Sequence, residues 1–178
     1  MRMLFLLFIL IALLNPVASQ TGTGGGAGSG ANAVKPKLTY RITAAKGWEK
    51  SDTLIGNSLI TLIISPLEHV GDTFRENLNI VTEDVGNMEM EEYYDISIQH
   101  LNSLPELKKQ GMMDTVMNGI DFRILHYTFA AETFDAEALV YLTIIKGKSY
   151  VITCGCLKGR MEYWRETFEE MIASFKVD

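Results

Sequence analysis

Residues 72–83, DTFRENLNIVTE, and the run that follows them decide how this chain folds. Their apolar side chains can share one face of an extended segment, while their polar side chains mostly point to the other face. This alternation has the two-residue period of a β-strand, so we expect a strand here. The apolar positions are Phe74, Leu78 and Ile80, and the polar positions are Asn77, Asn79 and Glu83.

Residues 87–104, NMEMEEYYDISIQHLNSL, have the 3.6-residue spacing of an amphipathic helix. Glutamates occupy the opening turns, where the helix dipole favours negative charge, and Pro105 ends the run. A strand, a short turn and a helix are therefore specified by local sequence. The stripe that we expect to be buried consists of Met90, Tyr93, Tyr94, Ser97, Leu101 and Leu104.

The segment at residues 74–101, FRENLNIVTEDVGNMEMEEYYDISIQHL, resembles the PsbP/Mog1-like superfamily and its small bacterial secreted domains. Members of that superfamily carry an F-x-E-N-hydrophobic strand, followed by a helix that is rich in Leu or Met and contains a Tyr. Further matches are KGWEK at residues 46–50, SYVITC at residues 149–154 and IASFK at residues 172–176. They follow the same order along the chain, and the resemblance covers about residues 38–177.

This resemblance implies an α+β fold with a central antiparallel β-sheet flanked by helices, arranged as an α/β/α sandwich. It does not imply one function. Such domains serve as extrinsic photosystem subunits, as a partner of a small GTPase and as envelope proteins of unknown role. Function must therefore be argued from the residues themselves.

The first residues of the chain predict export. Arg2 precedes an unbroken apolar run at residues 3–14, and small residues at 17–19 offer a cleavage site before Gln20. The run is too short to span a hydrocarbon core about 30 Å thick. We expect residues 1–19 to be a signal peptide and the protein to be secreted or periplasmic, in a bacterial envelope, without a transmembrane helix after cleavage. An uncleaved N-terminal anchor is the alternative.

A glycine-rich stretch, TGTGGGAGSGAN, occupies residues 21–32. It has no charged and no large side chain, so it cannot bury enough apolar surface to order itself. We expect residues 20–36 to form a flexible linker and residues 37–178 to form one domain. The chain has a net charge of −6, and because negative surfaces repel phosphate groups, we expect no nucleic-acid partner.

The remaining elements are predicted from apolar and alternating runs. Residues 108–118 carry Gly111 and three methionines, and we expect them to connect elements. Met112, Met113 and Met117 can form an adaptable binding surface, although methionines more often fill gaps in a core. We expect strands at residues 38–43, 59–65, 121–130, 136–145 and 150–154, and a final amphipathic helix at residues 160–175.

The loop at residues 65–73, SPLEHVGDT, gathers potential metal ligands. Glu68, His69 and Asp72 offer carboxylate oxygens and an imidazole, which together can bind a divalent cation. Their spacing matches no established metal motif. The favoured interpretation is a solvated polar loop at an edge of the sheet.

Two cysteines, Cys154 and Cys156, flank Gly155 at the end of a predicted strand. At this spacing their side chains project to the same face of the strand. In an oxidising compartment they could form a strained local disulfide, which would be labile and redox-active. They could also bind a soft metal ion. The favoured interpretation is packing, or an inert local disulfide.

The sequence lacks the parts of a hydrolase. It has no G-x-S-x-G motif, and no Ser or Cys has an evident His and acid partner. We therefore expect a non-enzymatic binding or accessory domain that acts through contacts with a protein partner in the cell envelope, without a cofactor. The alternative is a thiol-dependent redox or metal-handling protein that uses Cys154 and Cys156.

Overall fold

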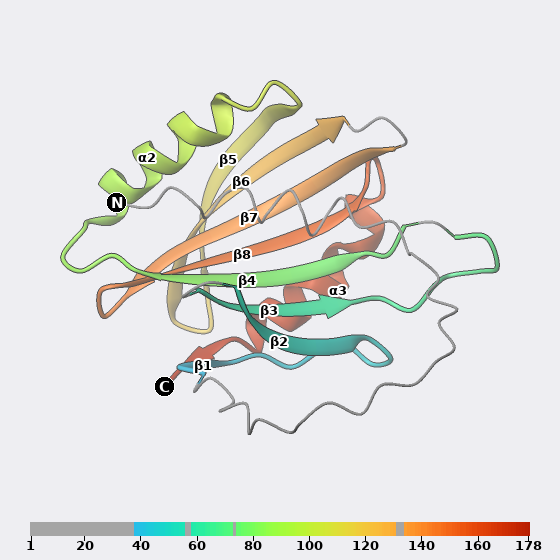
Figure 1. The fold of residues 1–178 in the computed structure, drawn as a ribbon, viewed down its shortest axis with the longest axis horizontal. Coiled ribbons are helices and arrows are strands. Elements are labelled where there is room, and N and C mark those ends of the chain that lie inside the picture. The colour runs from blue at the N-terminus through green and yellow to red at the C-terminus, as the bar shows by residue number, and fades with distance from the viewer. Residues whose placement is uncertain (1–37, 56–57, 73, 131–133) are drawn as a thin grey trace, which may run out of the picture.

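A computed structural model describes residues 38–55, 58–72, 74–130 and 134–178 (Figure 1). The predicted signal peptide and the predicted linker lie outside the described residues. Within the described ranges the chain forms nine strands and two helices. They are β1 (Tyr40–Arg41), β2 (Glu49–Ile55), β3 (Ser58–Ile64), β4 (Asn77–Asp84), α2 (Met90–Asn102), β5 (Leu107–Met117), β6 (Ile120–Ala130), β7 (Asp135–Ile145), β8 (Lys148–Leu157), α3 (Met161–Ala173) and β9 (Lys176–Val177).

Seven of these strands form one antiparallel sheet in the order β2-β3-β4-β8-β7-β6-β5. The short strands β1 and β9 pair with each other. Two runs of sequential hairpins therefore make up the sheet, β2 to β4 and β5 to β8, and the β4–β8 pairing joins them. Leu78 lies opposite Cys154 and Ile80 opposite Ile152 at this junction.

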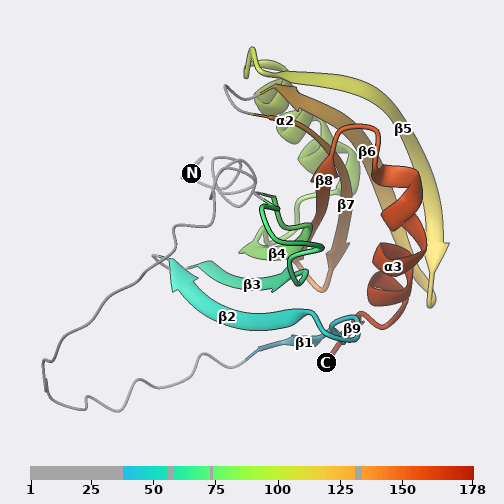
Figure 2. The same ribbon diagram turned by 90° about the vertical axis from the view of Figure 1, so that its right-hand side faces the viewer.

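The helices pack on opposite faces of the curved sheet (Figure 2). On the face that we name the α3 face, Phe168 of α3 is fully buried in a cluster with Leu78 and Ile152. On the other, the α2 face, Tyr93 and Leu101 of α2 pack with residues of β6, β7 and β8. The prediction of an α+β fold with a large antiparallel sheet and helices is confirmed, while its description as a complete α/β/α sandwich stays a prediction.

The strand and the helix that were predicted from residues 72–104 are confirmed as β4 and α2. Three of the six residues of the predicted stripe, Tyr93, Ser97 and Leu101, are buried in α2. The other three, Met90, Tyr94 and Leu104, are half-buried, and Leu104 lies beyond the end of the helix. The polar side of β4 is buried instead of facing solvent, since Asn77 and Asn79 are only 3% and 1% exposed. Both faces of this strand are therefore buried.

Neither of the two edge strands of the sheet, β2 and β5, was predicted. Residues 108–118, expected to be a connection, form β5, which pairs with β6 along its length with a register shift between Lys109 and Gly111. Strand β2, EKSDTLI, was not predicted. Edge strands carry charged side chains and irregularities that discourage further pairing, and these features hide the strand pattern. Strand β8 is also longer than the predicted strand at residues 150–154 and contains Cys156. It begins at Lys148, so only Lys146 and Gly147 lie between β7 and β8.

Candidate functional site

Strand β5 ends the sheet, and its outer side has no neighbouring strand in the part of the chain that the structure describes. Three large hydrophobic side chains of β5 are exposed to solvent: Met112 (49%), Met113 (59%) and Val116 (65%). The methionines that the sequence placed either in a core or on a binding surface are thus exposed at two of three positions. Met117 is half-buried and packs against the core of the α3 face.

The two halves of β5 differ in how they protect this edge. The first half contains Lys108 and Lys109 and the register shift, which are devices that oppose pairing with another chain. The second half, residues 112–117, has the sequence MMDTVM, with no lysine and no proline. We name residues 112–117 the β5 edge. This half is mostly apolar and has neither lysines nor a register shift to oppose pairing with another strand.

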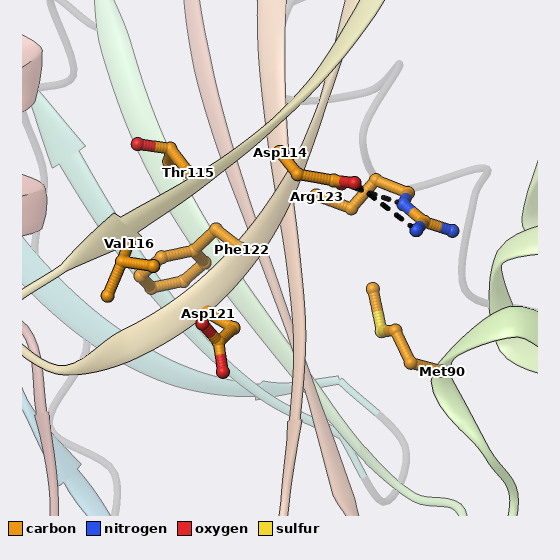
Figure 3. Close-up of a pocket in the computed structure, with 7 residues that line it drawn as sticks. All are labelled: Met90, Asp114, Thr115, Val116, Asp121, Phe122 and Arg123. Carbon is orange, nitrogen blue, oxygen red and sulfur yellow. Dashed lines mark hydrogen bonds and ion pairs between the residues drawn. The ribbon is translucent and has the colours of Figure 1, made fainter.

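A hollow of about 380 Å³ borders the β5 edge on the α2 face (Figure 3). Two exposed carboxylates, Asp114 and Asp121, and the guanidinium of Arg123 line it, and Met90 of α2 lies opposite them. We name it the acidic hollow. Its lining residues are Met90, Asp114, Thr115, Val116, Asp121, Phe122 and Arg123.

The one lining cation of the acidic hollow is already paired. Arg123 donates from Nε to Oδ1 of Asp114 (2.9 Å) and from Nη1 to Oε2 of Glu91 (2.7 Å), and its Cζ lies 4.7 Å from the ring centre of Tyr94. These hydrogen bonds lower the pKa of both carboxyls and raise the pKa of Arg123. Because two carboxylates pair with one guanidinium and Asp121 adds a third, the hollow carries net negative charge.

A second hollow, of about 320 Å³, borders the β5 edge on the α3 face. Its floor is apolar and is made by Ile124, Leu139 and Tyr141, while Arg165 and Glu169 of α3 form an ion pair of 3.9 Å at its wall. We name it the methionine hollow. Its lining residues are Gly111, Met112, Met113, Thr115, Met117, Ile124, His126, Leu139, Tyr141, Arg165 and Glu169.

The predicted polar loop uses its charged groups internally. Glu68 accepts a hydrogen bond of 2.8 Å from Arg160 at the start of α3, and Asp72 accepts bonds from the backbone N–H groups of Glu68 and Phe74. The Nδ1 atom of His69 lies 3.2 Å from the carbonyl oxygen of its neighbour Val70. The three side chains do not converge, and within the described ranges no group of three His, Cys, Asp or Glu residues is placed to hold a metal ion.

The two cysteines share the α3 face of β8, as their spacing predicted, and both are fully buried free thiols. Cys154 lies between Leu78 and Leu139, and Cys156 lies opposite Glu137. Burial raises the pKa of Cys154 well above its usual value and raises that of Cys156 to about 12, with a further contribution from the nearby carboxylate of Glu137. The thiolate form that redox and metal chemistry require is therefore disfavoured.

We expect the native protein to resist thiol alkylation. Each pKa unit changes the thiolate fraction tenfold, so a pKa of about 12 leaves Cys156 roughly a thousandfold less ionised below pH 9 than an ordinary cysteine of pKa about 9. Iodoacetamide labelling at pH 8, followed by mass spectrometry, should modify unfolded protein quickly and native protein very slowly. Rapid native labelling of either cysteine would contradict a packing role.

Sequence reasoning also missed a row of polar groups beside Cys156 on the α3 face. Glu76 is 3% exposed and accepts a hydrogen bond from Ser65, and burial raises its pKa. Glu137 bonds the ring of His126 at 2.6 Å and the backbone N–H of Gly159 at 2.8 Å. These groups are distant in sequence, and only the strand register brings them together. The bonds of Glu137 tie β7 to β6 and to the turn between β8 and α3, and the bond of Glu76 links the residue that follows β3 to the residue that precedes β4.

The sequence matches none of the known protein families, and no curated protein matches it. Its structure is similar to that of cyanobacterial PsbP (CyanoP) from Synechocystis sp. PCC 6803, with a TM-score of 0.56, 13% identity, and coverage of 89% of this chain and 99% of that chain. The protein has a PsbP-like fold. The resemblance to PsbP-like proteins is thereby confirmed at the level of the fold, while the α/β/α sandwich stays a prediction.

Two further solved structures are similar to this one, with comparable TM-scores. PA94, a protein of unknown function from Pseudomonas aeruginosa, has a TM-score of 0.56 and 12% identity over 70% of this chain and 94% of its own. A Bacteroides thetaiotaomicron protein has a TM-score of 0.55 and 13% identity over 79% of this chain, which corresponds to 45% of its own length. Identities this low establish the fold alone. Within the described ranges of this PsbP-like protein, no helix is both long and apolar enough to cross a bilayer.

Proposed function

We propose that this protein is a non-enzymatic accessory domain of the cell envelope, secreted or periplasmic, that acts through contacts with another protein. The β5 edge is the proposed contact surface. One observation carries this assignment: an open strand with three exposed apolar side chains has a hollow on each of its two faces. Exposed apolar surface of this kind typically marks an interaction site.

The polar side chains around the two hollows support a binding role over a catalytic one. Arg123 is held by Glu91 and Asp114, and His126 is held by Glu137. A catalytic acid or base needs an arrangement in which its proton can reach a bound substrate. These groups instead stabilise the strands that border the surface. The predicted signal peptide at residues 1–19 supports the envelope location, and we propose that α2 and α3 complete the α/β/α sandwich.

The alternative function, thiol-dependent redox or metal handling, requires an accessible thiolate at Cys154 or Cys156. Both thiols are fully buried on the α3 face. Neither lines the acidic hollow or the methionine hollow. We therefore give the cysteine pair a packing role in the proposed function.

Site-specific photocrosslinking in intact cells tests the contact surface. A photoreactive amino acid at Val116 should yield a discrete crosslinked protein, because this side chain is exposed on the β5 edge. The matched control is the same amino acid at Val70, which is fully exposed in the connection between β3 and β4. A partner captured equally well from both positions, or from Val70 alone, would contradict the assignment of the surface.

A further inference from the structure

The backbone of the β5 edge specifies the geometry of what it can bind. Antiparallel pairing with β6 uses the N–H and C=O groups on one side of β5, so those on the other side have no strand partner among the described residues. Their spacing repeats about every 6.8 Å, the length of two extended residues. Another extended chain supplies donors and acceptors at this repeat, which a helix or a compact loop cannot do.

Side chains of an added strand would alternate between the two faces of the sheet. The two hollows lie on these opposite faces, since Asp114 and its neighbour Arg123 point to the α2 face, whereas Met113 and Ile124 belong to the α3 face. Figure 3 shows Asp114 and Arg123 side by side, with Met90 of α2 across from them. Consecutive residues of the added strand would therefore enter different hollows.

The two hollows differ in chemistry. In the acidic hollow, Asp114 and Asp121 outnumber Arg123, which Glu91 also neutralises, so a lysine or arginine side chain fits there. The methionine hollow has an apolar floor, and the Arg165 guanidinium at its wall lies 3.9 Å from Glu169 and 3.1 Å from Glu162, which is outside the hollow. Flexible methionine side chains adapt to apolar groups of different shapes. An apolar side chain fits this second hollow.

We propose that the β5 edge binds an extended peptide segment that alternates basic and apolar residues and adds to the sheet beside β5. This inference rests on the proposed function and names the partner of the same surface. A second copy of β5 is a poor occupant, because residues 112–117 contain an acid, Asp114, and no base, and pairing would bring that acid to an acidic hollow. In keeping with the proposed function, the occupant that we propose is a segment of another protein.

Binding of synthetic octapeptides tests this proposal. The probe is an acetylated and amidated peptide of four Lys-Val repeats, and the control is its Glu-Val counterpart. We expect the Lys-Val peptide to shift the backbone amide resonances of residues 112–117 and to bind at least tenfold more tightly than the Glu-Val peptide. Absence of Lys-Val binding, equal binding of both peptides, or shifts confined to other strands would overturn the proposal.

N-methylated peptides separate strand addition from charge attraction. Because alternate residues of a strand direct their N–H groups to the same side, only one set can face β5. Two further probes carry methyl groups on the backbone nitrogens, one at every lysine and the other at every valine. We expect one of these peptides to bind at least tenfold more weakly and the other to retain its affinity. Retention by both would show that backbone pairing is not used and would overturn the proposal.

Two protein variants provide the matched test of charge. Asp121→Asn should weaken the Lys-Val peptide several-fold, because Asp121 lines the acidic hollow and makes no ion pair within the described residues. Glu170→Gln removes the same charge from an exposed position of α3 outside both hollows and should leave binding unchanged. Equal weakening by both variants would reveal unspecific attraction and overturn the assignment of the acidic hollow.

The experiments distinguish two claims: that the β5 edge is a contact surface, and that its partner binds by adding a strand beside β5. A crosslinked partner at Val116 combined with failure of the peptide series would leave the β5 edge as a contact surface and overturn strand addition. A concentration-dependent dimer in sedimentation that Val116→Lys abolishes would assign the edge to a second copy and would also overturn the proposal. Peptide binding without any crosslinked partner would leave strand addition standing and contradict the proposed cellular role of the edge.

Discussion

Replacing Phe168 with alanine is expected to lower the free energy of unfolding by about 3–5 kcal/mol, the range for removing a buried phenylalanine. Phe168 is fully buried in α3, where its ring meets Trp48 edge-on at a centroid distance of 5.9 Å. Shortening the side chain removes apolar contact and leaves a cavity beneath α3 that the surrounding strands cannot fill. Denaturant unfolding followed by circular dichroism measures the loss.

The matched control for Phe168→Ala is Tyr163→Ala on the same helix. Tyr163 is 69% exposed, and its ring packs beside Trp164 and below the guanidinium of Arg160. Its removal should cost less than about 1 kcal/mol, since surface substitutions usually have small effects. Equal losses in the two variants would show that α3 does not carry the core of the α3 face.

Gly147→Ala is expected to destabilise the protein by about 2–5 kcal/mol. Gly147 has a φ of 73°, a left-handed conformation that costs other residues about 1–2 kcal/mol. An added Cβ would also lie 2.7 Å from the carbonyl oxygen of Gly86, and this crowding adds about 1–3 kcal/mol. The backbone N–H groups of Val85 and Gly86 both donate to the Gly147 carbonyl, so the turn cannot move away freely.

Gly119→Ala isolates the conformational part of this loss. Gly119 has a φ of 77° and occupies the same position of the equivalent two-residue turn, between β5 and β6. No atom lies within 4 Å of a Cβ placed there. Its replacement should therefore cost only about 1–2 kcal/mol in the same unfolding experiment. If Gly119→Ala proved as costly as Gly147→Ala, the contact with Gly86 would have no energetic weight.

The centre of the fold could be predicted from the sequence, and its edges could not. Strands β4, β6 and β7 and both helices have continuous apolar runs or stripes, because each buries side chains along its whole length. The alternation of polar and apolar residues is less clear in β5, because most of its side chains are exposed and a register shift interrupts the two-residue period near Gly111. Strand β2 was missed because residues 49–53 are polar and exposed, which hides the alternation of a strand.

Only part of the candidate site could be predicted from the sequence. Residue chemistry drew attention to Cys154, Cys156 and the loop with Glu68, but the fold buries the thiols and pairs Glu68 with Arg160. The sequence left two roles open for the methionines, a binding surface or the filling of a core. Their exposure in the structure favours the binding surface at Met112 and Met113. The two hollows depend on how α2 and α3 pack beside β5, and on the pairing of Arg123 with Glu91. No local sequence pattern encodes such distant contacts.

The junction between β4 and β8 has a consequence for how the protein folds. Each run of hairpins joins neighbours in the sequence and can form early, whereas Leu78 must find Cys154 across a long loop. This pairing is therefore expected to close late. Until then, β4 and β8 each leave one side unpaired, although most of their side chains are buried in the finished sheet. The interval before closure is when the nascent chain is most prone to aggregate and most in need of a chaperone.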